Sequence, residues 1–179
     1  MSTNLTSNPS WQKLEALRAD IEKMCLSAGE ARCSAVPQDG SWSVKQVVDH
    51  ILKSEAGTLQ YIQKKSSFPD TLPSTTPSAF LRAFLLQAAL RSPFRFQAPH
   101  PVKAADVQEL PSMEHLLTQW REIRRSWQIF LENYPEEFLS KLVFRHPLAG
   151  RLTIFQTLRF MADHLKRHQK QIQRLLHSP

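Results

Sequence analysis

The stretch from Thr153 to His177 reads TIFQTLRFMADHLKRHQKQIQRLLH and carries a clear helical pattern. Thr153 and Gln156 form a capping box, in which each residue satisfies a backbone N–H of the other, so the stretch predicts that a helix begins here. Apolar residues then recur at intervals of three and four, the spacing of one helix face. They are Phe155, Leu158, Ala162, Leu165, Ile172, Leu175 and Leu176. The pattern predicts an amphipathic helix that continues almost to the C-terminus.

Three earlier stretches show the same apolar spacing, and each opens with a residue that favours a helix start. They cover about 8–36, 43–65 and 112–134. The middle stretch has a second capping box, formed by Ser43 and Gln46. The sequence therefore predicts four long amphipathic helices.

Residues 66–111 separate the second and third long helices and hold seven of the twelve prolines. A connection of this length without secondary structure is unusual inside a compact domain. We therefore expect a short extra helix over about 77–91. It is followed by an extended crossover over 91–111 that packs Phe94 and Phe96.

The composition agrees with an all-α fold. Only four glycines occur in 179 residues, whereas an all-β domain needs many turn glycines. The length suits one domain with a sizeable core. We expect a single domain over residues 1–179, folded as an antiparallel four-helix bundle with a long proline-rich crossover between the second and third helices.

The net charge of +7 is concentrated near the C-terminus. Residues 141–179 hold eight Lys and Arg residues and one acid, Asp163, whereas residues 1–140 hold fifteen of each sign. Such an excess could attract a small anion, a nucleic acid or a membrane surface, or it could form a solvated helix face. No nucleic-acid-binding motif accompanies it, so we do not expect a nucleic acid partner.

We expect a cytoplasmic protein that does not enter a membrane. The first ten residues lack the order of a signal peptide, and no apolar run approaches the roughly 20 residues of a membrane span. Cys25 and Cys33 lie eight residues apart in the first predicted helix. On a straight helix they would not meet, so we expect no disulfide between them.

His164 and His168 are the first candidates for chemistry. Residues four apart lie on the same face of a helix, so two imidazoles can bind one metal ion. Both fall at or inside the apolar face, opposite the charged residues of the same helix. The pair alone is weak evidence, because many helices carry such a pair without metal. A third ligand is needed.

Five other histidines could supply the third ligand. Four lie in predicted loops or near the end of a helix: His100, His115, His146 and His177. His50 lies well inside a long helix, at the border of its apolar stripe, and is the best candidate on geometry.

Several segments of the chain resemble the DinB/YfiT-like superfamily. They are Trp42-Ser43-Val44 with Asp49-His50-Ile51-Leu52, the approach His146-Pro147-Leu148-Ala149-Gly150, and His164-x-x-x-His168-x-x-Gln171-Ile172 in the last helix. The resemblance covers nearly the whole chain. It implies a four-helix bundle in which His50, His164 and His168 bind one divalent metal ion.

The resemblance also implies candidate functions. Characterised relatives include transferases that use a low-molecular-weight thiol such as bacillithiol or mycothiol, and many members have no assigned activity. The alternatives are therefore a metal-dependent thiol transferase, a metal-dependent hydrolase, and a non-catalytic metal-binding or ligand-binding stress protein. The catalytic residues stay open. An anionic small-molecule thiol is the expected cosubstrate, and a homodimer is the assembly that the superfamily suggests.

Three imidazoles leave a tetrahedral ion with one open position, which is typical of catalytic rather than structural zinc. Imidazole suits several divalent metals. We expect zinc or nickel, with iron and copper as alternatives.

Glu55 falls within the apolar stripe of the second helix. A buried carboxylate is costly unless it is paired. This favours a bond between helices, to an arginine or to a tryptophan N–H, over the role of a general base. We expect Trp42, Trp120 and Trp127 to be core residues rather than ligand-stacking ones.

Overall fold

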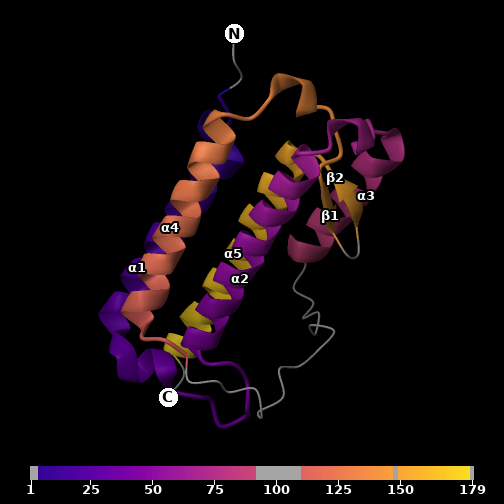
Figure 1. Ribbon diagram of the computed structural model, residues 1–179. Coiled ribbons are helices and arrows are strands. Elements are labelled where there is room, and N and C mark those ends of the chain that lie inside the picture. The colour runs from indigo at the N-terminus through magenta and orange to yellow at the C-terminus, as the bar shows by residue number, and fades with distance from the viewer. Residues whose placement is uncertain (1–3, 92–109, 147–148, 178–179) are drawn as a thin grey trace.

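The computed structural model describes residues 4–91, 110–146 and 149–177 (Figure 1). Within these ranges the protein is mostly helical, as predicted, with five α-helices and one small sheet of two strands. The helices are α1 (Pro9–Ser34), α2 (Val44–Ser66), α3 (Pro77–Arg91), α4 (Met113–Glu132) and α5 (Ile154–His177). The strands are β1 (Phe144–His146) and β2 (Gly150–Leu152), and short 3-10 turns lie at Leu5–Ser7, Pro69–Thr71 and Glu136–Phe138.

The predicted start signals act as helix caps. The side chain of Ser43 accepts from the backbone N–H of Gln46, and the Gln46 side chain accepts from the N–H of Ser43. Thr153 and Gln156 form the same reciprocal pair at the start of α5. These bonds satisfy backbone donors that have no partner inside the helix. Both capping boxes are confirmed.

The four long helices lie side by side and enclose the core (Figure 1). Helix α1 contacts α5, α2 and α4, and α2 contacts α4 and α5. The predicted apolar faces supply the buried side chains, and the largest of these include Trp120 and Trp127. Their burial confirms the prediction that both are core residues.

The connection between α2 and α4 contains the predicted short helix, α3, which packs against α5 and β2. The expected packing of Phe94 and Phe96 falls on residues outside the described ranges. The hairpin of β1 and β2 was not predicted. It pairs Phe144 with Leu152 in an antiparallel register, just before α5 begins.

Helix α1 is not straight, and this corrects one expectation about the cysteines. Gly29 has a φ of 77°, a left-handed conformation that glycine adopts without strain, and it kinks the helix between Cys25 and Cys33. Across the kink the thiol of Cys33 donates to the backbone carbonyl oxygen of Cys25 at 3.5 Å. Both cysteines are buried and free in the structure.

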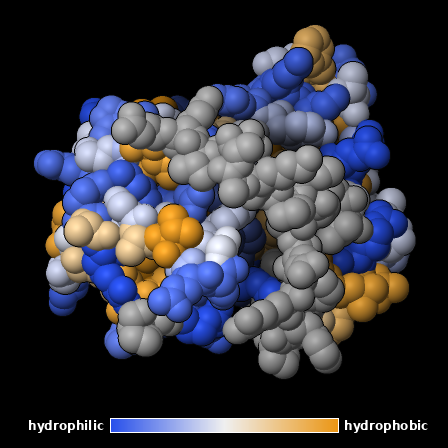
Figure 2. Space-filling view, turned by 90° about the horizontal axis from the view of Figure 1, so that it is seen from below, coloured by the Kyte–Doolittle hydropathy of each residue, from blue (hydrophilic) through white to orange (hydrophobic). Residues whose placement is uncertain are grey.

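Hydrophilic side chains dominate the visible surface at the end of the molecule where α5 finishes, with hydrophobic patches between them (Figure 2). Among the described helices, none combines the length and the apolar composition that a membrane span requires.

Candidate metal centre

His50, His164 and His168 come together between α2 and α5. His50 lies in the second turn of α2, and the other two lie midway along α5. One nitrogen from each ring lies within 4.8 Å of the other two. The structure therefore brings together the three histidines that the sequence singled out.

The two histidines of α5 face each other as their spacing requires. Their Nε2 atoms are 3.1 Å apart, and their rings are nearly perpendicular. The other nitrogen of His168, Nδ1, lies 3.0 Å from Oε1 of Gln171. Because an amide oxygen only accepts, this contact places the proton of His168 on Nδ1. The lone pair of Nε2 then points toward His164.

Burial keeps the three rings neutral. Desolvation lowers the pKa of His164 well below its ordinary value, and the neighbouring His168 and His50 lower it further. Burial, with a smaller effect of His50, lowers the pKa of His168 to about 4. It also lowers the pKa of His50. At neutral pH each ring therefore has an unprotonated nitrogen, which is the form that binds a metal ion.

Aromatic side chains flank the cluster on two sides. The ring of Trp42 lies 5.2 Å from that of His50, so this half-buried residue borders the site and is not simply a core residue. Phe160 stacks on His164 at 5.6 Å, and His146 packs edge-on against Phe160 at 4.6 Å. The sequence analysis missed Phe160, although its place one turn before His164 on the same face was a usable signal.

His146 is not a ligand in this arrangement. It lies in β1, and its Nδ1 accepts the backbone N–H of Ala149 at 3.1 Å. His115 and His177 are exposed on other surfaces, and His100 falls outside the described ranges. Within the described residues, His50, His164 and His168 are the one group of three metal-ligating side chains in mutual reach.

A model of the DinB superfamily matches residues 13–172. The chain belongs to the DinB superfamily. The match spans both helices of the histidine cluster and the kinked α1. Comparison with curated proteins and with solved structures found no match.

The donor set of this DinB protein fits a divalent metal ion. Zinc binds imidazole nitrogen at about 2.0–2.1 Å, which in a tetrahedral site puts two ligand nitrogens about 3.4 Å apart. The 3.1 Å between the Nε2 atoms of His164 and His168 is close to that separation. The nitrogen of His50 lies within 4.8 Å of both.

The two aspartates beside the ligands are engaged elsewhere. Asp49 pairs with Lys53 at 2.7 Å, one turn along α2. Asp163 is buried and pairs with Lys13 of α1 at 3.1 Å. The three histidines thus form a site of neutral nitrogen donors, and the charge of a bound ion would be balanced by a further anionic ligand.

Glu55 belongs to a second buried cluster, between α2 and α4. Its two carboxylate oxygens accept from Arg124 at 2.7 Å and from the indole N–H of Trp120 at 2.8 Å. Its backbone carbonyl accepts from the indole of Trp127. The guanidinium of Arg124 also lies 3.4 Å from a carboxylate oxygen of Glu15. These contacts confirm the structural prediction for Glu55, which bonds both an arginine and a tryptophan N–H.

Proposed function

We propose that this DinB protein binds one divalent metal ion through His50, His164 and His168 and uses it to transfer a low-molecular-weight thiol to an electrophile. The observation that carries the proposal is the convergence of three imidazoles from α2 and α5 within 4.8 Å. The family membership supports it, and so does the packing of the four long helices, which we take to be an antiparallel bundle.

A metal ion held by three imidazoles lowers the pKa of a water molecule or thiol at its open position. The protein's own residues supply the rest. Neutral rings offer their lone pairs without first losing a proton, because burial has already lowered their pKa. Gln171 holds the ring of His168 in one orientation. Phe160 stacks on the ring of His164 and Trp42 packs at a tilt against His50, which limits access of bulk water to these two rings.

The metal and the cosubstrate follow from the same chemistry. Three imidazoles and no thiolate favour zinc or nickel, with iron and copper as alternatives. A thiol that also carries carboxylate groups would complement the basic excess of residues 141–179.

Elemental analysis of protein purified without a histidine tag tests the metal site. We expect close to one metal ion per chain, and loss of the ion in His50→Ala. The matched control is His115→Ala, because His115 is exposed on α4 and is not one of the three grouped histidines. Equal metal content in His50→Ala and wild type would overturn the site.

A conjugation screen tests the activity. Metal-loaded protein is offered bacillithiol, mycothiol, glutathione and coenzyme A, each with monobromobimane as the electrophile. Turnover that requires metal and disappears in His168→Ala but not in His115→Ala supports the transferase. If the protein instead hydrolyses activated esters, and this activity also requires metal and His168, the protein is a metal-dependent hydrolase rather than a transferase. A metal-loaded protein that is inactive in all assays would instead be a binding protein.

A further inference from the structure

The outer face of the β1–β2 hairpin carries two arginines directly opposite each other. The antiparallel register pairs Arg145 with Arg151, and both side chains are exposed. Residues that face each other across two strands project from the same side of the sheet, with their Cβ atoms about 5 Å apart. Like charges in such a pair repel and destabilise the hairpin. A short hairpin is therefore an unfavourable place for this pair unless something else offsets the repulsion.

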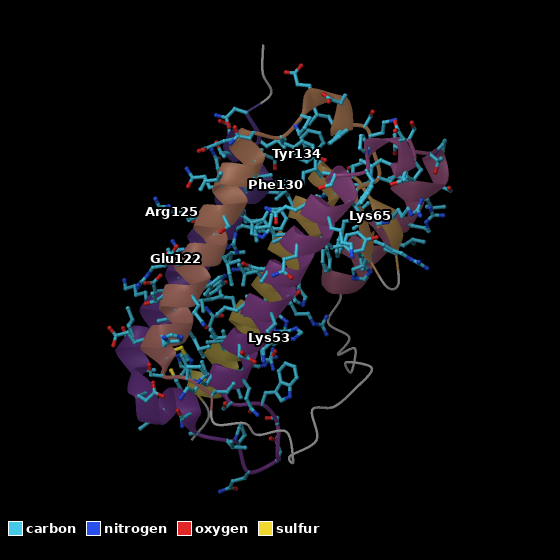
Figure 3. All side chains as sticks on the ribbon, in the orientation of Figure 1. Lys53, Lys65, Glu122, Arg125, Phe130 and Tyr134 are labelled. Atoms are coloured by element: carbon cyan, nitrogen blue, oxygen red, sulfur yellow. The ribbon has the colours of Figure 1, made fainter. Side chains whose placement is uncertain are left out.

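Two further cations lie beside strand β2. The side chain of Arg82, from α3, lies over Gly150, where its Nε would be 3.4 Å from a Cβ atom. Lys65, at the end of α2, lines the same depression as Arg151, together with Tyr61 and Thr71. Figure 3 shows that Lys65 lies where the end of α2 comes beside the strands. We call Lys65, Arg82, Arg145 and Arg151 the hairpin cluster.

The hairpin cluster has no neutralising acid in the part of the chain that the structure describes. Among the described residues, no ion pair joins a nitrogen of the hairpin cluster to a carboxylate, whereas several other basic residues are paired. Arg18 pairs with Glu22, Lys45 with Glu30, and Arg124 with Glu55. The basic excess near the C-terminus is therefore partly gathered into one uncompensated site.

We propose that the hairpin cluster binds a phosphate group. Guanidinium groups donate paired N–H bonds that match the spacing of phosphate oxygens, and two adjacent arginines can contact one group together. Lys65 adds a point charge from the other side of the depression. The site is distinct from the histidine cluster, since it is built from α3, the end of α2 and the hairpin rather than from the middle of α2 and α5.

A compact phosphate group suits this site better than a nucleic acid strand. A single-stranded nucleic acid needs exposed aromatic rings on which bases stack. The two aromatic side chains beside the cluster, Tyr61 and Phe144, pack edge-on against each other at 5.6 Å. Phosphate itself can come from a soluble phosphorylated compound or from a lipid headgroup. Exposed Leu81, Phe84 and Leu85 on α3 would contact the acyl region in the second case.

Thermal unfolding of the metal-free protein tests the site, with inorganic phosphate as the probe and chloride at equal ionic strength as the reference. We expect phosphate at about ten times its dissociation constant to raise the melting temperature by about 3 °C. The double variant R145Q/R151Q should lose this shift, and it should melt no lower than wild type in chloride because the repulsion is gone. Lys170→Gln, an exposed cation near the other end of α5, should keep the shift.

His168→Ala should also keep the shift, which separates this site from the proposed metal centre. The proposal is overturned if R145Q/R151Q keeps the full phosphate shift, or if wild type responds equally to phosphate and chloride. If the double variant does not fold, the exposed substitution Lys65→Gln gives the same comparison.

Vesicle sedimentation then distinguishes the two sources of phosphate. The phosphate belongs to a lipid headgroup if the protein binds vesicles that contain phosphatidic acid but not vesicles of phosphatidylcholine alone. This binding must be lost when Arg145 and Arg151 are replaced. A phosphate shift without vesicle binding assigns a soluble compound. An oligonucleotide that binds through the same arginines, while inorganic phosphate has no effect, would replace the phosphate site by a nucleic acid surface.

Discussion

His50 and Glu55 lie five residues apart on α2, yet they belong to two very different polar clusters. Five residues turn a helix by about 140°, so His50 faces α5 while Glu55 faces α4. In the Glu55 cluster both carboxylate oxygens of Glu55 have a donor within the protein. In the histidine cluster one nitrogen of each ring lies within 4.8 Å of the other two, and the two rings of α5 have only each other as partners at their Nε2 atoms. A buried carboxylate whose oxygens both have donors can serve the fold alone, whereas three neutral imidazoles gathered at one point can also bind a cation.

The sharpest way to break this comparison is to remove the charge of Glu55. Glu55→Gln keeps the shape but removes the nearer carboxylate partner of buried Arg124, which is left with Glu15 at 3.4 Å. Loss of one partner of a buried ion pair costs about 3–5 kcal/mol, so we expect the free energy of unfolding in urea to fall by about that much. The control is Lys53→Ala on the same helix, whose exposed pair with Asp49 should contribute less than about 1 kcal/mol. Equal effects of the two variants would mean that the Glu55 cluster is not structural.

The histidine cluster should make the metal-free protein sensitive to acid. Burial lowers the pKa of His168 from 6.5 to about 4 in the folded state. Between these values the unfolded chain binds a proton that the folded chain does not, so the stabilisation is complete above pH 6.5 and is lost as the pH falls through 4. The loss reaches about 1.4 kcal/mol per pH unit, or about 3 kcal/mol in all for His168.

Urea unfolding at several pH values, with chelator present, measures this dependence. In His168→Gln the side chain at this position does not titrate, so the difference between the variant and wild type isolates the contribution of His168. If the two proteins lose stability in parallel between pH 6.5 and 4, the ring of His168 is not held neutral by burial.

In the histidine cluster a metal ion should take the place that Arg124 and the tryptophans have in the Glu55 cluster. It should therefore stabilise the folded protein. We expect zinc at a free concentration of 100 times its dissociation constant to stabilise the wild type by about 2.7 kcal/mol. His164→Ala should abolish this gain, whereas Glu55→Gln should keep it despite its lower starting stability, because Glu55 faces away from the site. Calorimetric melting with zinc and with chelator makes the comparison. A zinc gain that survives in His164→Ala would place the ion elsewhere.

The sequence allowed the helices and both clusters to be predicted for specific reasons. Capping boxes at Ser43 and Thr153 are local signals, and the i, i+4 spacing of His164 and His168 fixes a common face. Glu55 stood out because a carboxylate in an apolar stripe requires a partner. The identity of that partner could only be given as a class, since Arg124 lies on another helix and depends on how α2 packs against α4.

Other features depended on tertiary structure and were missed. The hairpin of β1 and β2 has strands of only three residues, too short to show an alternating pattern. Gly29 lies within an otherwise continuous helical pattern, so its left-handed kink and the meeting of Cys25 and Cys33 could not be foreseen. The pairing of Arg145 with Arg151 depends on the register of the hairpin.

The smallest expected effect is on zinc affinity when Gln171 is replaced, and it tests the difference between the two clusters most finely. In the Glu55 cluster every partner is part of the fold, but in the histidine cluster Gln171 acts on the proposed metal only through His168, by accepting from Nδ1 at 3.0 Å. Removing such an orienting partner typically lowers metal affinity by about 10–100-fold. Gln171→Ala should therefore weaken zinc binding about tenfold in a competition titration, while the free energy of unfolding of the metal-free protein changes little. Gln171→Glu should restore or tighten binding, because a carboxylate accepts the same hydrogen bond and makes the ring a stronger donor. If both variants bind zinc as the wild type does, the orientation of His168 is set by packing against its neighbours rather than by this hydrogen bond.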